Sequence, residues 1–294
     1  MPIDYLDDFI ENALREDVGD GDHTSLACIP DGAMGKAQLL VKEEGIIAGV
    51  KVAEQILRKA DPEVIIEIFV NDGEVVKPMN IVFIVEGKIR ALLKAERLVL
   101  NVMQRMSGIA TTTRHYVERL NGLKTRILDT RKTTPGMRIL EKLAVKTGGG
   151  TNHRFGLFDM ILIKDNHIDF AGSIPNAINR TREYLKKTGK DLLIEIEARS
   201  LDDISTILSV GGVDRIMLDN FDINTTREAV KMIGEQFETE SSGGITYENI
   251  RNYAECGVDF ISVGALTHHL KSLDLSLKAL NYKNDEFGPT HLYI

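Results

Sequence analysis

The first apolar residues of the chain recur three and four positions apart, which predicts an opening amphipathic helix. They are Ile3, Leu6, Phe9, Ile10, Ala13 and Leu14. The pattern then predicts strands within 36–50, 64–70 and 81–85 and a helix over 52–59. A helical pattern continues over 91–120, with an interruption expected near Ser107 and Gly108. This first third is therefore predicted to be a mixed α+β unit, with a domain junction inside the long helix.

From Thr125 onward, short apolar strand cores alternate with polar loops and helical stretches. The predicted cores are 126–128, 160–163, 192–196, 215–218, 237–239 and 260–263. Six such units in about 140 residues favour a parallel sheet closed, or nearly closed, into an α/β barrel, with an open doubly wound sheet as the alternative. The last segment, 270–280, is expected to be an amphipathic helix that packs back on the first domain.

Composition narrows the class of protein. The 294 residues are 43% hydrophobic and 27% charged, as in globular proteins, and the net charge of −8 argues against binding to nucleic acid or to an anionic membrane. Cys28 and Cys256 have no metal-site spacing and are expected to be free thiols. The start of the chain lacks the features of a signal peptide, and no apolar stretch is long enough to cross a bilayer. We therefore expect a cytoplasmic protein.

One early stretch, Glu16 to Thr24, superficially suggests a calcium loop. Counted from Asp17, the twelfth position of such a loop is Cys28, where an EF-hand needs a carboxylate. We interpret it as a turn whose polar side chains bind backbone groups.

A cluster of cationic residues follows the first predicted barrel strands. Arg131 and Lys132 follow the first strand, His153 and Arg154 follow a run of three glycines, and Lys164 follows an apolar strand directly. Between positions 131 and 167 there are seven Lys or Arg and three Asp or Glu, a local charge of +4. Because the loops after barrel strands form active sites, this charge predicts a pocket for a strongly anionic ligand. The alternative is a solvated basic face.

Carboxylates end the next two strands. Side chains alternate along a strand, so Glu195 and Glu197 lie on one face, and Asp219 ends the neighbouring strand. Such a pair could hold ribose hydroxyls, bind magnesium and stabilise developing positive charge. The alternative is an edge strand whose carboxylates face solvent.

Two loops of small residues follow the last predicted strands. Ser242, Gly243 and Gly244 form one, and Gly264 with Ala265 forms the other. Small residues let backbone amides approach a ligand, and phosphate commonly binds in these loops of a barrel. His268 could reach a pyrophosphate, whereas a metal pair with His269 is disfavoured because adjacent side chains diverge.

From the residues alone, several functions therefore remain open. The combination suits an enzyme for phosphorylated, highly anionic substrates. A barrel lyase with Lys164 as a Schiff-base amine is an alternative, as is a non-catalytic ligand-binding or assembly protein.

The joint pattern resembles the quinolinate phosphoribosyltransferase family in order over nearly the whole chain. The matching segments are 16–24, 96–101, 104–111, 129–136, 148–154, 162–167, 195–197, 218–221, 240–244 and 263–268. The resemblance implies an N-terminal α/β sandwich over 1–105, an incomplete seven-stranded α/β barrel over 106–267, and a C-terminal helix over 268–294 that returns to the sandwich. It also implies a homodimer that exchanges residues between active sites.

The same resemblance assigns roles to individual positions. Arg97 would be supplied by the other subunit. The quinolinate pocket would comprise Arg131, His153, Arg154 and Lys164, with Thr130 and Lys132 beside them. Glu197 and Asp219 would hold the ribose hydroxyls and Mg²⁺. Ser242, Gly243, Gly244, Gly264 and Ala265 would bind the 5′-phosphate, with His268 near the pyrophosphate. Lys132, Lys164, Glu197 and Asp219 would be the catalytic set.

The implied reaction joins quinolinate to phosphoribosyl pyrophosphate. The pyridine nitrogen would attack C1 of the sugar as pyrophosphate leaves, and decarboxylation at C2 would follow. A sibling phosphoribosyltransferase for another anionic base is the nearest alternative.

Overall fold

The computed structural model describes residues 4–280. Its contacts divide the chain into two units. Unit 1 comprises residues 1–111, 139–147 and 271–294, and unit 2 comprises 112–138 and 148–270. The division lies inside a long helix, six residues beyond the junction expected at residue 105. It also assigns most of helix α5 (Arg138–Thr147), which falls within the barrel domain expected over 106–267, to unit 1.

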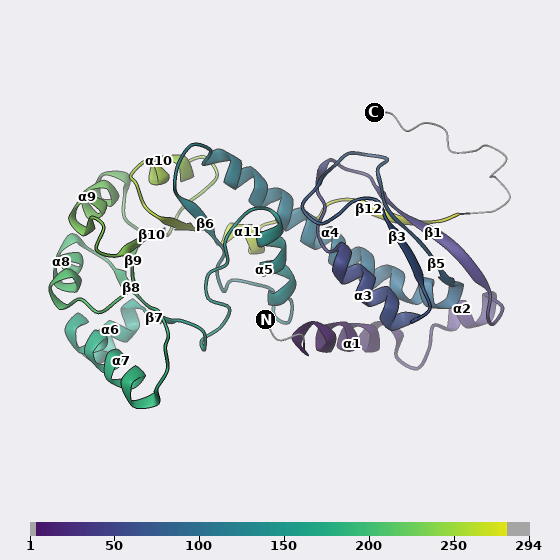
Figure 1. The fold of residues 1–294 in the computed structure, drawn as a ribbon, viewed down its shortest axis with the longest axis horizontal. Coiled ribbons are helices and arrows are strands. Elements are labelled where there is room, and N and C mark those ends of the chain that lie inside the picture. Colours follow the sequence, from purple (N-terminus) through teal and green to yellow (C-terminus); the bar gives the residue numbers. More distant parts are fainter. Residues whose placement is uncertain (1–3, 281–294) are drawn as a thin grey trace. The chain divides into compact units, whose positions relative to one another are not determined.

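Unit 1 is built on a four-stranded antiparallel sheet in the order β12-β1-β5-β3 (Figure 1). The strands are β1 (Met34–Val41), β3 (Ile65–Ile68), β5 (Ile81–Lys88) and β12 (Leu275–Leu280), and β2 (Gly45–Ile46) pairs separately with β4 (Val75–Val76). Helices α1 (Asp4–Val18) and α3 (Val50–Ala60) occupy the stretches where helices were predicted. Helix α3 buries Ala53, Ile56 and Leu57, the stripe that its helical periodicity indicated.

The long helix α4 (Ile89–Arg119) is continuous, so the interruption expected near Ser107 and Gly108 is wrong. The two residues instead mark close packing within unit 1. The Ser107 hydroxyl accepts a hydrogen bond from the Ala48 amide at 2.9 Å, and a Cβ on Gly108 would lie 2.2 Å from the Lys271 carbonyl oxygen. The helix tolerates this glycine because the neighbouring backbone needs the space.

The predicted C-terminal helix is also wrong where the structure describes it. Residues 275–280 form strand β12, which pairs antiparallel with β1, and the predicted remainder, 281–294, lies outside the described residues. Leu273, Leu275 and Leu277 alternate with polar residues at period two, and the free edge of β1 supplies the partner. The segment thus belongs to unit 1 through strand pairing.

Unit 2 is a parallel α/β barrel with an opening. Its strands are β6 (Arg126–Leu128), β7 (Ile161–Ile163), β8 (Ile194–Ala198), β9 (Arg215–Asp219), β10 (Glu238–Ser242) and β11 (Phe260–Ser262). They pair in the order β6-β11-β10-β9-β8-β7, and Thr151 adds one parallel bridge to Leu128. The expected incomplete barrel of seven strands is therefore six strands and a one-residue bridge. A doubly wound sheet is excluded because β6 pairs with β11, the last strand of the barrel.

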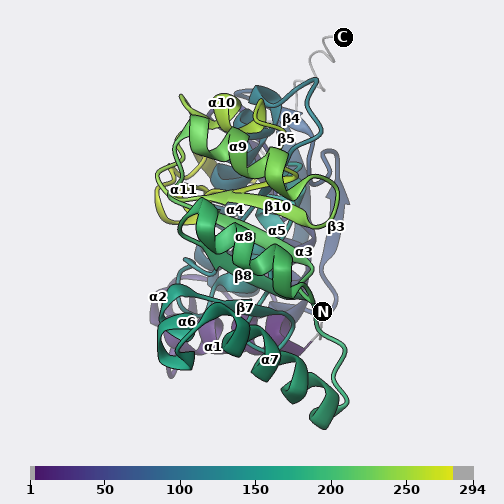
Figure 2. The ribbon, with the colours of Figure 1, turned by 90° about the vertical axis from the view of Figure 1, so that its left-hand side faces the viewer.

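Helices cover the outside of this sheet. They are α6 (Asp165–Ala171), α7 (Ile174–Thr188), α8 (Leu201–Val210), α9 (Ile223–Ile233) and α10 (Ile250–Ala254), followed by the short α11 (Ala265–His268). Both views show α8 and α9 outside β8 and β10 (Figures 1 and 2). The side chains of Ser173, Ser200 and Asp222 cap the starts of α7, α8 and α9. Each helix therefore begins at a defined point beyond its strand, leaving the strand ends to the loops that carry the candidate site.

Membrane insertion finds no support in the described part of the chain, where every helix is too short or too polar to cross a bilayer.

Candidate active site

A cavity of about 600 Å³ lies in unit 2 at the carboxyl ends of the strands. It brings together eleven of the fifteen predicted site residues: Thr130, Arg131, Lys132, His153, Arg154, Lys164, Glu197, Asp219, Ser242, Gly243 and Gly244. Parallel strands place all their following loops at one end of a barrel, so residues more than 100 positions apart converge there.

The carboxylates lie inside the barrel and not on a solvated edge. Strand β8 is paired on both sides, and Glu195 and Glu197 are 0% and 5% exposed. Glu197 Oε1 forms an ion pair with Lys164 Nζ, and its Oε2 accepts a hydrogen bond from the Asp165 amide at 3.1 Å. The interpretation as an edge strand is therefore wrong. The Lys164 ammonium and the Glu197 carboxylate form one charged pair at the cavity wall.

Asp219 faces the same space from the end of β9. Burial raises the pKa of its carboxyl, and the charge of Glu197 raises it further. Asn220 follows in a left-handed conformation with φ 57°, and its side-chain nitrogen Nδ2 donates to Asp219 Oδ2 at 3.0 Å. Two carboxylates that destabilise each other's charge favour a cation or ribose hydroxyls between them.

Cations occupy another part of the cavity lining. Burial lowers the pKa of the Arg154 guanidinium, and the neighbouring charge of Arg131 lowers it further. The Lys132 carbonyl accepts a hydrogen bond from the Thr267 hydroxyl at 2.8 Å, which fixes the loop after β6. Two guanidiniums that destabilise each other bind an anion more readily than a single one. The predicted cluster is smaller than the sequence count suggested, because Lys142 and Lys146 lie on α5 in unit 1.

His153 is a buried member of this lining. Its side chain is 6% exposed, with Nε2 3.0 Å from Glu195 Oε2 and 3.5 Å from Glu240 Oε2, while Nδ1 accepts the Arg154 amide at 2.7 Å. Burial lowers the pKa of His153, but the two carboxylates at Nε2 outweigh it and raise the pKa. An Nδ1 that accepts the Arg154 amide carries no proton, so this contact belongs to the neutral ring with its proton on Nε2. Burial beside Glu240 also raises the pKa of Glu195, to about 7. The imidazole therefore lies between buried acids and the backbone of the cationic loop.

The glycine loop after β10 forms a further part of the cavity lining. Gly243 has φ 94°, and a Cβ there would lie 2.2 Å from Asn220 Oδ1, so only glycine fits. Gly244, at φ 61°, has open space on its Cβ side. The loop thus presents backbone atoms to the cavity next to the carboxylates, as a phosphate subsite requires.

Four predicted residues lie outside the residues that line the cavity. Gly264 is adjacent to it, since a Cβ there would lie 3.2 Å from Lys132 Cδ. Ala265 and His268 belong to α11, and burial and the nearby His269 lower the pKa of His268. Arg97 is exposed on α4 in unit 1, so its assignment to a partner's site stays a prediction.

The structure adds lining residues that the sequence did not single out: Leu162, Met217, Asn220, Glu240 and Ser262. Period-two alternation along β10 would have placed Glu240 on the same face as Ser242. The close fit of Asn220 against Gly243 has no comparable sequence signal, because it joins two loops from different strands.

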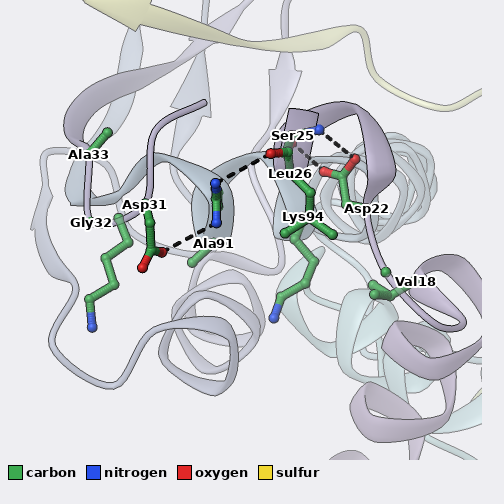
Figure 3. Close-up of a pocket in the computed structure, with 12 residues that line it drawn as sticks. Val18, Asp22, Ser25, Leu26, Asp31, Gly32, Ala33, Ala91 and Lys94 are labelled. Carbon is green, nitrogen blue, oxygen red and sulfur yellow. Dashed lines mark hydrogen bonds and ion pairs between the residues drawn. The ribbon is translucent and has the colours of Figure 1, made fainter. Parts of the chain in front are cut away.

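A second hollow, of about 310 Å³, lies in unit 1 between α2 (His23–Cys28), the loop at 31–33 and the start of α4 (Figure 3). Asp22 accepts the Ser25 amide at 3.1 Å, and Arg90 binds the Ile29 carbonyl at 2.6 Å and Asp31 at 3.3 Å. The Asp22 contact confirms the interpretation of the stretch Glu16 to Thr24 as a turn whose polar side chains bind backbone groups, whereas Arg90 holds the segment that follows it. Since its polar groups hold the turn, we do not regard the hollow as the active site.

The comparisons with known proteins agree with this geometry. The family model "Quinolinate phosphoribosyl transferase, C-terminal domain" matches residues 109–278, and the corresponding N-terminal domain model matches 22–107. A "Quinolinate phosphoribosyltransferase [decarboxylating] 1b" of Nicotiana tabacum is 43% identical over 292 residues, covering 94% of this chain and 83% of the relative. A "Probable nicotinate-nucleotide pyrophosphorylase [carboxylating]" of Bacillus subtilis is 40% identical, covering 92% of each chain. The crystal structure of NadC from Streptococcus pyogenes is 38% identical with a TM-score of 0.87, covering 94% of this chain and 97% of that one.

Proposed function

The chain belongs to the quinolinate phosphoribosyltransferase family, and on that premise we propose that it converts quinolinate and phosphoribosyl pyrophosphate into nicotinate mononucleotide, pyrophosphate and carbon dioxide. This is the carboxylating nicotinate-nucleotide pyrophosphorylase reaction named for its relatives. The observation that carries the proposal is one cavity in which a cationic lining, a carboxylate pair and a glycine loop meet.

The two anionic substrates repel each other, and binding them side by side is the first task of the site. Arg131, Arg154 and Lys164 would orient the dicarboxylate, and the loop at Gly243 and Gly244 would hold the 5′-phosphate. Fixed cations offset the repulsion, so much of the rate acceleration is positioning and electrostatics.

Bond formation and bond cleavage follow in order. The pyridine nitrogen forms a bond to C1 of the sugar as the C1–O bond to pyrophosphate breaks. Glu197 and Asp219 lie where they stabilise the positive charge that develops on the sugar ring. The C2–carboxylate bond then breaks, carbon dioxide leaves, and the electron pair stays at C2 beside the now cationic nitrogen until a proton is taken up. No covalent enzyme intermediate is needed, and the relatives support this reaction and not the Schiff-base lyase.

Magnesium is proposed as the metal of the reaction. Glu197 and Asp219 fit it, since they are oxygen donors in one cavity, and burial together with the charge of Glu197 raises the pKa of Asp219. Bound with the substrate phosphates, the ion would neutralise the leaving pyrophosphate. Lys164, which forms an ion pair with Glu197, would then be available to the dicarboxylate.

The remaining parts of the proposal concern the assembly and its location. We propose a homodimer in which Arg97 completes the partner's site. Mixing inactive Arg97→Ala and Lys132→Ala proteins after reversible dissociation should restore about a quarter of full activity, because half of the random dimers carry one intact site. No recovery would refute the exchange of residues. A cytoplasmic location is proposed because Cys28 and Cys256 are free.

The decisive experiment supplies both substrates and Mg²⁺ and measures carbon dioxide and nicotinate mononucleotide. Wild type should form the two products in equal amounts, and Lys132→Ala should lose activity. Lys124→Ala, which removes a lysine paired with Asp259 at the far end of β11, is the matched control and should retain activity. Turnover of nicotinate but not of quinolinate would refute the substrate assignment.

A further inference from the structure

Three barrel strands place four ionisable side chains together at the cavity, and one of them, Glu240, belongs to its lining. Glu195 lies in register with Arg215, and Arg215 with Glu238, so β8, β9 and β10 present these groups side by side. Glu240 lies two residues beyond Glu238 on the same face of β10. Arg215 Nη1 contacts Glu240 Oε2 at 3.2 Å, and both Glu195 and Glu240 are 0% exposed. Burying a carboxylate without a partner costs free energy, and the contacts with Arg215 offset part of that cost.

His153 is the partner that connects these acids to the cavity. Glu195 Oε2 and Glu240 Oε2 lie 3.0 and 3.5 Å from its Nε2, and its ring spans the gap to the Arg154 amide, which donates to Nδ1 at 2.7 Å. The contacts thus run from the buried acids through one rigid ring to the backbone of a cavity-lining arginine.

The loop has a second anchor on the backbone side. Asp129, which is 0% exposed, accepts the His153 amide at 2.8 Å and the Asn152 side-chain amide at 2.6 Å. The Arg154 guanidinium donates to the Met160 carbonyl at 3.3 Å. Asp129 fixes the start of the loop, and the imidazole fixes the Arg154 amide from within the barrel.

We propose that Glu195 and Glu240 are positioning residues: they hold the His153 ring and, through it, fix Arg154 for binding of the pyridine dicarboxylate. This inference rests on the proposed function, because it concerns the part of the site that would bind the dicarboxylate. Arg215 balances the charge of Glu240 and stacks on Phe260, with the guanidinium carbon 3.9 Å from the ring centre. The acids can therefore stay buried while the loop above them binds a ligand.

The test is the Glu240→Gln variant, which keeps the side-chain shape and removes the charge. Its dissociation constant for quinolinate, measured by calorimetry without the second substrate, should rise about tenfold or more, as for the loss of a buried charge-assisted hydrogen bond. The KM for phosphoribosyl pyrophosphate should stay within about twofold, because the phosphate loop does not depend on the ring. Glu238→Gln is the matched control: it contacts the same Arg215, 2.8 Å away, but not His153, and should bind quinolinate as wild type does.

Further variants keep the inference falsifiable if Glu240→Gln fails to fold. Glu195→Gln should show the same selective loss. His153→Asn, whose amide oxygen can replace Nδ1 as the acceptor for Arg154, should bind quinolinate more tightly than His153→Leu. Unchanged quinolinate binding in both glutamine variants, or an equal rise for both substrates, would overturn the proposal.

One other outcome would also overturn it. The ligand atoms of His153, Glu195 and Glu240 all lie within 4.8 Å of one another, a spacing that could hold a metal ion. A stoichiometric transition metal in purified wild type, lost on Glu240→Gln, would assign the cluster to metal binding. If wild type itself releases no carbon dioxide but still binds quinolinate in this Glu240-dependent way, the proposed function fails and the positioning role stands.

Discussion

Replacing Gly243 by alanine perturbs the phosphate loop at its most constrained point. The backbone there has φ 94°, and the new Cβ would lie 2.2 Å from Oδ1, 2.6 Å from Cγ and 3.0 Å from the backbone nitrogen of Asn220. Side chains essentially never approach so closely, and the 3.0 Å contact is to backbone, which cannot rotate away. We therefore expect Asn220 to move.

The magnitude can be estimated from the contacts that this movement disturbs. Alanine in a left-handed conformation costs about 1–2 kcal/mol. Moving Asn220 weakens its side-chain bond to Asp219, 3.0 Å, and its amide bond to the Ser242 carbonyl, 2.8 Å, at about 0.5–1.5 kcal/mol each. Gly243→Ala should therefore lower the free energy of unfolding by about 2–5 kcal/mol.

Gly244→Ala is the matched control, because its φ of 61° carries the same kind of backbone cost but its Cβ side is open. It should lose only about 1–2 kcal/mol of stability. The difference between the variants thus isolates the contact with Asn220. Since that contact reaches Asp219, kcat/KM for phosphoribosyl pyrophosphate should fall about 10- to 100-fold more in Gly243→Ala than in Gly244→Ala.

The assays are urea unfolding and steady-state release of carbon dioxide with each substrate varied in turn. Equal stability and equal kcat/KM in the two alanine variants would refute the reasoning, because only the contact with Asn220 distinguishes them.

Three further predictions concern other parts of the molecule. Glu197→Gln should lower kcat/KM for phosphoribosyl pyrophosphate about 100-fold and raise the Mg²⁺ concentration needed for half-maximal rate, and an unchanged Mg²⁺ titration would contradict the carboxylate's role. Gly108→Ala normally stabilises a helix, but here the new Cβ would lie 2.2 Å from the Lys271 carbonyl oxygen. We therefore expect the free energy of unfolding in urea to fall by about 2 kcal/mol or more. A gain in stability would show that the Lys271 backbone can move aside. Asp259→Asn should lose about 1–2 kcal/mol at neutral pH, because Asp259 accepts the amide and hydroxyl of Thr239 at 2.9 and 2.8 Å. Burial raises the pKa of Asp259, but hydrogen bonds from Lys124 and Thr239 outweigh it and hold the pKa below its usual value. The loss of stability in Asp259→Asn should therefore be full above about pH 4 and shrink as the pH falls through the pKa of the folded protein. A loss of stability that does not depend on pH would contradict this prediction.

The barrel could be predicted from the sequence because its strands are buried on both faces. Such strands read as short apolar runs between turn residues, and all six predicted cores overlap the observed strands. The position of the carboxylates followed from the same argument: Glu197 and Asp219 end neighbouring strands, so the topology alone brings them to one cavity. The charged pair of Glu197 with Lys164 could not be predicted, because it depends on how two side chains turn within that cavity.

The strand β12 shows a different limit. Over six residues, the pattern Leu-Ser-Leu-Lys-Ala-Leu suits both a helix stripe and a strand face, and local periodicity does not choose between them. The strand forms because β1, more than 230 residues earlier in the chain, has an edge of unpaired backbone groups. A strand can pair with these groups and a helix cannot. The buried acids Glu195 and Glu240 follow the same logic. Each is unfavourable in isolation. Their burial becomes possible because the register of three strands places Arg215 beside them and a loop from elsewhere in the barrel adds His153. Where a residue's conformation depends on a partner that the chain supplies elsewhere, the local sequence indicates the chemistry but not the pairing.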